Sequence, residues 1–139
     1  MFDFFNKNNN PNEKVLGNLT TNQKMSVTYF LYLMAICDGE LNKEELRYLD
    51  TCYLGYSFEK CASYLDSVGR MNLFNDLNKL TSFQKDYLII TTLELLSCDG
   101  RPNEQEYDTF LNGFEKLGYT EDTILAVIDK ATLLKKKFM

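Results

Sequence analysis

The sequence contains no histidine and no tryptophan, and only two prolines are found among its 139 residues. Histidine is the commonest general base and transition-metal ligand of proteins, so its absence excludes Ser-His-Asp triads, Cys-His dyads and His-based zinc sites. Acidic residues outnumber basic ones by 20 to 15, which gives a net charge of −5. A nucleic-acid binder needs a dense patch of Lys and Arg to contact phosphates, so this charge balance argues against nucleic acid as a partner.

Long apolar segments and targeting signals are also missing. The longest nearly apolar stretch, residues 29–37, is far too short to cross a bilayer. Residues 1–5 lack the basic start and the apolar core of a signal peptide. We therefore expect a cytoplasmic protein without stable membrane insertion. A weak peripheral contact is the most that residues 1–5 or the lysines at 135–137 would support.

The four cysteines do not have the spacing of a metal site or a redox centre. None belongs to a CxxC pair, and their sequence neighbours are largely apolar. We expect free, buried thiols at these positions, which are Cys37, Cys52, Cys61 and Cys98. Since no histidine is present to activate a thiol, the sequence predicts a protein that is not an enzyme.

The chain repeats its own pattern, first at an offset of 61 residues and then at an offset of 63. The matched segments are 19–24 with 80–85, 37–39 with 98–100, and 54–57 with 117–120. A length of 139 residues with 45% hydrophobic residues suits one folded domain. We predict a flexible tail over residues 1–18, followed by a single domain over 19–139 built from repeats 19–69 and 80–135.

Each repeat carries the start signals of three helices. In a capping box, a Thr or Asn side chain accepts a hydrogen bond from the backbone N–H of a Gln or Glu three residues later. The Gln or Glu side chain in turn accepts the backbone N–H of the Thr or Asn. The capping boxes are Thr20 with Gln23 and Asn42 with Glu45 in the first repeat, and Thr81 with Gln84 and Asn103 with Glu106 in the second. The apolar runs that follow Thr20 and Thr81 are short enough to be strands. The capping boxes favour helices that are covered on all sides in the middle of a bundle.

Apolar side chains at helical spacing predict the buried faces of the second and third helices. In the second helices they are Leu46, Leu49 and Tyr53, and Tyr107, Phe110 and Phe114. In the third helices, which follow the N-caps Ser57 and Thr120, they are Leu65 and Val68, and Ile124, Val127 and Ile128. With a short linking helix around residues 72–79, the predicted fold class is all-α, a compact bundle of about seven helices built from two pseudo-symmetric repeats.

A duplicated acidic motif is the strongest candidate for chemistry. The motif Asp-Gly-x5-Glu begins at Asp38 and ends at Glu45, and it recurs between Asp99 and Glu106. Its spacing is that of the second half of an EF-hand loop, but the first half is missing from both copies. If the repeats pack about a pseudo-twofold axis, the two turns face each other and bring four carboxylates together. All the donors are oxygens, so such a site would favour Ca²⁺, Mg²⁺ or Mn²⁺ over zinc.

The same residues also have a purely structural interpretation. The aspartates support the turns that end helices, and the glutamates close capping boxes. Glu40 stands opposite Arg101 in the repeat, so an ion pair across the axis would also neutralise the acidic site. Both interpretations remain open at the level of the sequence.

The motif and its surroundings resemble the TerB-like domain, which occurs in tellurite-resistance proteins and at the N-terminus of DjlA-type co-chaperones. The resemblance rests on an apolar helix ending in Asp-Gly, on residues 40–46, and on the second copy at 97–106, and it covers residues 19–135. It implies an internally duplicated helical module tied to stress or tellurite response. The acidic positions proposed to bind a metal in the family are Asp38, Glu45, Asp99 and Glu106 in this chain.

The chain departs from the family pattern at two places. Cys37 and Cys98 replace the small residue that is common before Asp-Gly, and Arg101-Pro102 replaces a polar and aliphatic pair. Three functions remain. The first is a non-enzymatic TerB-like module that binds a protein partner, with a divalent cation as an added option. The second is a structural protein–protein adaptor without metal, and the third is a carboxylate-based divalent-metal hydrolase.

Overall fold

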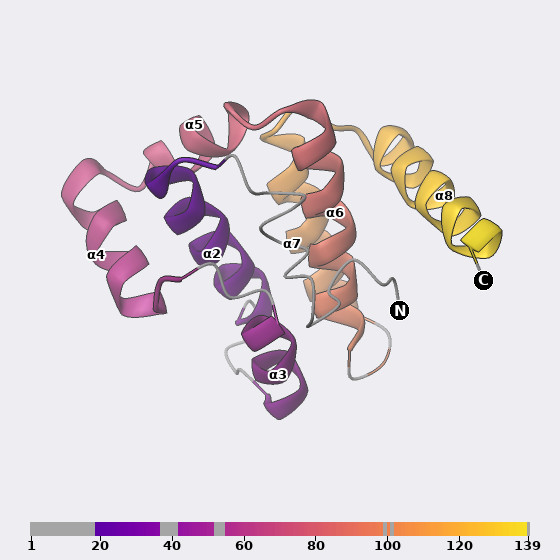
Figure 1. The fold of residues 1–139 in the computed structure, drawn as a ribbon, viewed down its shortest axis with the longest axis horizontal. Helices are drawn as coiled ribbons and strands as arrows, with labels where there is room; N and C mark the ends of the chain where they lie inside the picture. The colour runs from indigo at the N-terminus through magenta and orange to yellow at the C-terminus, as the bar shows by residue number, and fades with distance from the viewer. Residues whose placement is uncertain (1–18, 37–41, 52–54, 99, 101, 139) are drawn as a thin grey trace.

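The computed structural model describes residues 19–36, 42–51, 55–98, 100 and 102–138. Within these residues the chain forms seven helices and no strand, so the predicted all-α bundle is confirmed (Figure 1). The helices are α2 (Thr21–Ala35), α3 (Lys43–Thr51), α4 (Phe58–Val68), α5 (Asn72–Asn78), α6 (Ser82–Ser97), α7 (Glu104–Glu115) and α8 (Glu121–Phe138). The predicted linking helix is α5. The predicted tail, residues 1–18, lies outside the described residues.

The two apolar helices begin at the predicted capping boxes. The backbone N–H of Gln23 donates to Oγ1 of Thr20 at 3.1 Å, and the Thr20 N–H donates to Oε1 of Gln23 at 2.9 Å. Thr81 and Gln84 form the same pair of bonds at the same distances. Each box satisfies two backbone donors that the first turn of a helix leaves without partners. Local sequence therefore determines where α2 and α6 begin.

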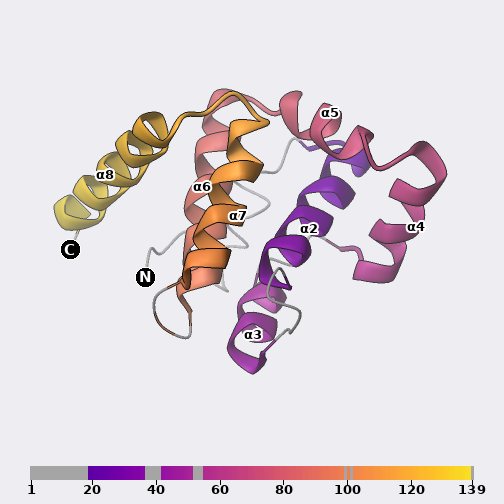
Figure 2. The same ribbon diagram turned by 180° about the vertical axis from the view of Figure 1, so that it is seen from behind.

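The helices α2 and α6 form the centre of the bundle. They contact each other, α3 also contacts α6, and α7 also contacts α2, so each second helix packs against the first helix of the other half. Figures 1 and 2 show α4 and α5 flanking α2 while α8 flanks α6. Residues 25–31 of α2 are all buried, as expected for a helix covered on every side. The helices follow one order in both halves, and the pseudo-twofold relation between the halves stays a prediction.

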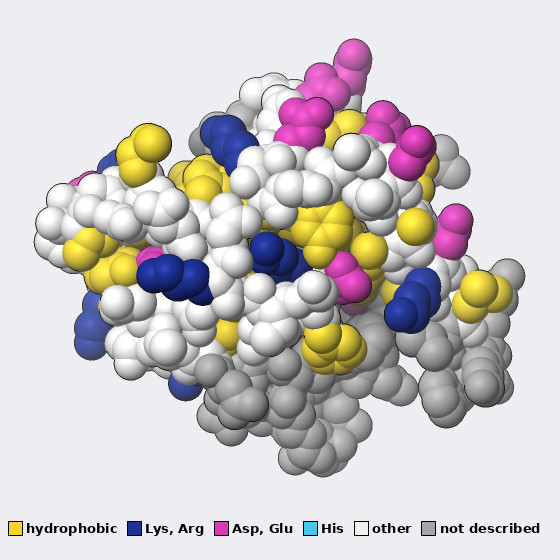
Figure 3. All heavy atoms as spheres, turned by 90° about the horizontal axis from the view of Figure 1, so that it is seen from above, with side chains coloured by type: hydrophobic (Ala, Val, Ile, Leu, Met, Phe, Trp, Pro, Cys, Tyr) yellow, Lys and Arg dark blue, Asp and Glu magenta, His cyan; other side chains and the backbone are white. Residues whose placement is uncertain are grey.

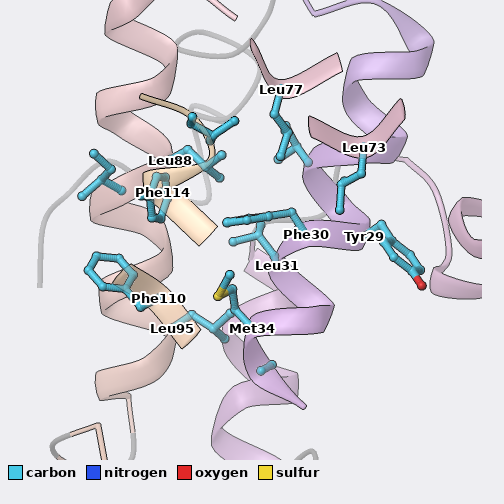
Figure 4. Close-up of a cluster of buried hydrophobic side chains, with 14 of the residues drawn as sticks. Tyr29, Phe30, Leu31, Met34, Leu73, Leu77, Leu88, Leu95, Phe110 and Phe114 are labelled. Carbon is cyan, nitrogen blue, oxygen red and sulfur yellow. The ribbon is translucent and has the colours of Figure 1, made fainter. Parts of the chain in front are cut away.

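Aromatic rings fill the space between α2 and α7. Phe30, Phe110 and Phe114 have no more than 1% of their surface exposed. The ring of Phe114 lies edge-on to Phe30, with centroids 5.4 Å apart, and 5.2 Å from Phe110. Figure 4 shows Phe30 and Met34 reaching from α2 toward this pair. Such T-shaped contacts stabilise aromatic clusters beyond the gain from burial alone.

A glycine in the left-handed region follows the end of α7. Gly118 has a φ of 92°, which a residue with a side chain adopts only at a cost. Its N–H donates to the carbonyl of Glu115 at 3.0 Å, and the Tyr119 N–H donates to the carbonyl of Phe114 at 3.1 Å. The Tyr119 ring then lies 6.1 Å from the Phe114 ring, which is the apolar contact that accompanies this motif. The turn thus joins the end of α7 to the core.

Two predicted core positions are wrong. Leu46 is 42% exposed and Val68 is 43% exposed. On α3 the buried side chains are Glu45, Tyr48 and Leu49, which share a face at helical spacing with a charged residue among them. On α4 the buried residues are Cys61 and Leu65, so Val68 lies beyond the face that contacts α2 and α5.

At Gly113 the backbone of α7 lies close against side chains of α2. A β-carbon at this position would lie 2.6 Å from Cε of Met34 and 3.3 Å from two ring atoms of Phe30. The absence of a side chain therefore lets the two helices approach, which outweighs the poor helix propensity of glycine.

The substitution Gly113→Val is expected to lower the free energy of unfolding by about 1–3 kcal/mol, because the core around it is already filled. Urea unfolding followed by circular dichroism measures the change. Asn112→Val introduces the same side chain at the exposed neighbouring position and should cost no more than about 0.5 kcal/mol. Equal losses in both variants would show that the contact of position 113 with Met34 and Phe30 does not set the cost.

Candidate acidic site

The ends of α2 and α6 bring the flanks of both acidic motifs to one end of the bundle. The two helices contact each other, and Figures 1 and 2 show them running in the same direction. Their C-terminal ends, at Ala35 and Ser97, therefore lie at the same end of the molecule. The next helices, α3 and α7, begin at Lys43 and Glu104, a few residues after the Asp-Gly pairs of the two motifs in the sequence. This arrangement is the one that converging carboxylates would require.

The structure describes only half of the predicted ligands. Asp38 and Asp99 lie outside the described residues, as do Glu40 and Arg101. The distance between the two aspartates, and the alternative ion pair across the axis, therefore stay predictions. Glu45 and Glu106 are described and carry the structural evidence.

Glu45 is a buried carboxylate in a complete capping box. Only 2% of its surface is exposed. Its Oε1 accepts the backbone N–H of Asn42 at 3.2 Å, and its own N–H donates to Oδ1 of Asn42 at 2.8 Å. The acidic side chain in the first turn also interacts favourably with the helix dipole. The predicted structural role of Glu45 is thus confirmed.

Glu106 repeats this geometry at the start of α7. It is 8% exposed, its Oε1 accepts the Asn103 N–H at 3.0 Å, and its N–H donates to the Asn103 Oδ1 at 2.8 Å. The residues on either side of Glu106 in the sequence line a shallow hollow. They are Asn103, Glu104, Gln105, Asp108 and Thr109. The beginning of α7 therefore combines a buried glutamate with an acidic outer surface.

Glu94 is an acidic residue near the site that was not predicted from the sequence. This residue lies on α6, one turn before the helix ends, and both of its carboxylate oxygens are shielded from solvent. Its position adds a third acidic side chain toward the end of the bundle where the motifs lie. An acidic residue inside the otherwise apolar run 88–98 was the available signal, but it belongs to no recognised spacing.

The described residues fit a hard cation only in part. Glu45 and Glu106 each use Oε1 in a capping bond. Among the described residues no three Asp, Glu, Cys or His side chains lie close enough to hold a metal ion. A cation between the motifs would therefore depend on Asp38 and Asp99 together with Glu45 and Glu106. The all-oxygen donor set is suited to Ca²⁺, Mg²⁺ or Mn²⁺.

The two described cysteines are free thiols. Cys61 is fully buried, as predicted, whereas Cys98 is only half-buried. Burial raises the pKa of the Cys61 thiol to about 11, so this sulfur is protonated and unreactive at neutral pH. Cys37 and Cys52 lie outside the described residues.

A separate polar cluster joins three helices on the other side of α2. Asp76 of α5 is 8% exposed, and its Oδ2 accepts the hydroxyl of Ser26 on α2 and the hydroxyl of Tyr64 on α4, both at 2.7 Å. Burial and the adjacent carboxylate raise the pKa of Tyr64 to about 12. In the second half, Tyr119 donates to Asp86 at 2.7 Å, and the pKa of Tyr119 is raised for the same reasons. These bonds join separate elements of the bundle to one another.

None of the described helices is both long and apolar enough to cross a bilayer. Compared with protein-family models, curated proteins and solved structures, the chain matches none of them. The likeness to the TerB-like domain therefore rests on the motifs of the sequence alone.

Proposed function

We propose that the chain is a non-enzymatic, TerB-like helical module that binds a divalent cation at its acidic end and a protein partner. The observation that carries this proposal is the matched placement of Glu45 and Glu106. Both are buried at the third position of a second helix, and each is the last residue of an Asp-Gly-x5-Glu motif. Buried carboxylates gathered at one end repel each other unless a cation, a proton or a basic side chain offsets their charge.

The proposal that the chain is not an enzyme rests on its missing histidine and on its unreactive thiol. The sequence has no histidine to serve as a general base. The raised pKa of Cys61 keeps that thiol protonated at neutral pH. The link to stress or tellurite response comes from the motif resemblance, and the cation would act by stabilising the fold that a partner binds.

Thermal unfolding with and without cation tests the proposal. At a hundredfold excess over the dissociation constant, Ca²⁺ or Mn²⁺ is expected to stabilise the fold by about 2.7 kcal/mol, which corresponds to a rise in melting temperature of about 8–10 °C. The double variant Asp38→Asn/Asp99→Asn should lose this response. The matched control, Asp66→Asn/Asp129→Asn, removes two exposed aspartates at repeat-related positions and should keep it.

An adaptor without metal is the second candidate, and the capping bonds of Glu45 and Glu106 favour it. Those bonds give both glutamates a structural role that needs no ion. Under this alternative, millimolar cation leaves the melting temperature of the wild type unchanged. That outcome would contradict the cation site, while turnover of a phosphate ester with Mn²⁺ above background would contradict the non-enzymatic assignment.

A further inference from the structure

Phe83 is exposed at the end of the bundle opposite the acidic motifs. It lies in the first turn of α6, and 63% of its surface is open to solvent. The other phenylalanine side chains that the structure describes are buried or half-buried. A large exposed ring in the first turn of a helix contributes nothing to the core, and such residues recur at protein interfaces.

Charged residues of opposite sign lie on the α5 side and on the α8 side of the start of α6. On one side are Lys79 and Lys85, and Nζ of Lys85 is 3.4 Å from Oδ1 of Asn78. On the other side are the exposed Glu121 and Asp122 in the first turn of α8. The hydrogen bond from Tyr119 to Asp86, at 2.7 Å, joins these two sides. We call residues 78–86 and 119–122 the end face.

Figure 3 views the molecule from this end. Most of the dark-blue side chains lie on the side of α4 and α5, and most of the magenta ones lie on the side of α7 and α8. Hydrophobic side chains are visible between them. The charge on this view is therefore divided into a basic half and an acidic half.

We propose that the end face binds a second copy of the chain about a twofold axis. A twofold rotation about an axis through such a face places the basic half of one protomer against the acidic half of the other. The two Phe83 rings would then meet near the axis, where a partner would remove them from water. A purely acidic partner would match Lys79 and Lys85 but would repel Glu121 and Asp122. A second copy complements both halves at once.

Sedimentation of the full chain over about a hundredfold range of concentration tests this proposal. The average mass of the wild type is expected to rise from 16.2 kDa toward twice that value. Phe83→Ser should weaken association at least about tenfold, and added salt should weaken it as well. Lys43→Glu, at an exposed position on α3, is the control for a single charge reversal and should leave association unchanged.

A charge-swap experiment identifies the face and its symmetry. The variant Lys79→Glu/Lys85→Glu leaves no lysine on the end face, and Glu121→Lys/Asp122→Lys leaves Asp86 as its one acidic residue. Each alone should be monomeric, whereas an equimolar mixture should form a heterodimer at least as tight as the wild-type dimer. Circular dichroism checks that both variants are folded. A wild type that stays monomeric overturns the proposal, and so does a dimer that neither Phe83→Ser nor the swap affects.

Discussion

Replacement of Phe114 by alanine is expected to lower the free energy of unfolding by about 3–5 kcal/mol, the usual range for truncating a buried aromatic ring. Phe114 is fully buried and lies between Phe30 of α2 and Phe110 of its own helix. Its backbone carbonyl also accepts a hydrogen bond from the Tyr119 N–H at the end of α7. A domain of this size has a total stability of about 5–15 kcal/mol, so the variant would lose a large part of it.

Urea unfolding followed by circular dichroism measures this loss, since the midpoint falls in proportion to the free energy if the slope is unchanged. Leu133→Ala removes a large apolar side chain from a position of α8 that is 67% exposed, and it should change the stability by no more than about 0.5 kcal/mol. A loss below about 1 kcal/mol for Phe114→Ala would mean that the core tolerates the cavity by collapsing around it. That result would contradict the tight packing of α7 against α2.

The sequence predicts the helix starts well because their signals are local. The bonds between Thr20 and Gln23, or between Asn103 and Glu106, form within four consecutive residues and satisfy the first turn of a helix in any surroundings. The same holds for the stop at Gly118, where a positive φ ends α7. Such signals locate the elements but do not say which neighbours they contact.

The buried faces depend on those neighbours, and there the sequence predicts less. In the predicted second helix the apolar residues at 46, 49 and 53 have helical spacing, and residue 53 lies outside the described residues. Residues 45, 48 and 49 of α3 have helical spacing as well, and they include a glutamate. Favouring the more apolar set led to the wrong prediction for Leu46, which is 42% exposed. On α3, which contacts both α2 and α6, the buried face is the one that includes Glu45. Tertiary packing thus overrides the simplest amphipathic pattern.

At the candidate site, too, local features were predicted and long-range ones were not. The capping bonds of Glu45 and Glu106 follow from spacing alone and are confirmed. Glu94 and Asp76 were missed because a single acidic residue in an apolar segment has no motif. Asp76 bonds Ser26, which is 50 residues away in the chain, so no local pattern could have shown the pair.

The second large effect is expected for Asp76→Ala, at about 2–4 kcal/mol of unfolding free energy. Oδ2 of Asp76 accepts two hydroxyl hydrogen bonds, from Ser26 and from Tyr64, and hydrogen bonds to a charged group contribute more than neutral ones. Ser26 is fully buried, so its hydroxyl would lose a partner that water does not replace. Because Leu73 and Leu77 also attach α5 to the core, the helix itself should remain folded.

Asp76→Asn separates the charge from the geometry, since an amide oxygen still accepts a hydroxyl hydrogen bond. This variant should lose only about 1 kcal/mol, and Tyr64→Phe should lose a similar amount because one of the two bonds is removed. In a double-mutant cycle, Tyr64→Phe should cost little in the Asp76→Ala background, where its partner is already absent. Strictly additive losses in that cycle would show that the Tyr64 hydroxyl and the Asp76 carboxylate do not interact in solution, and α5 would then be held by its leucines alone.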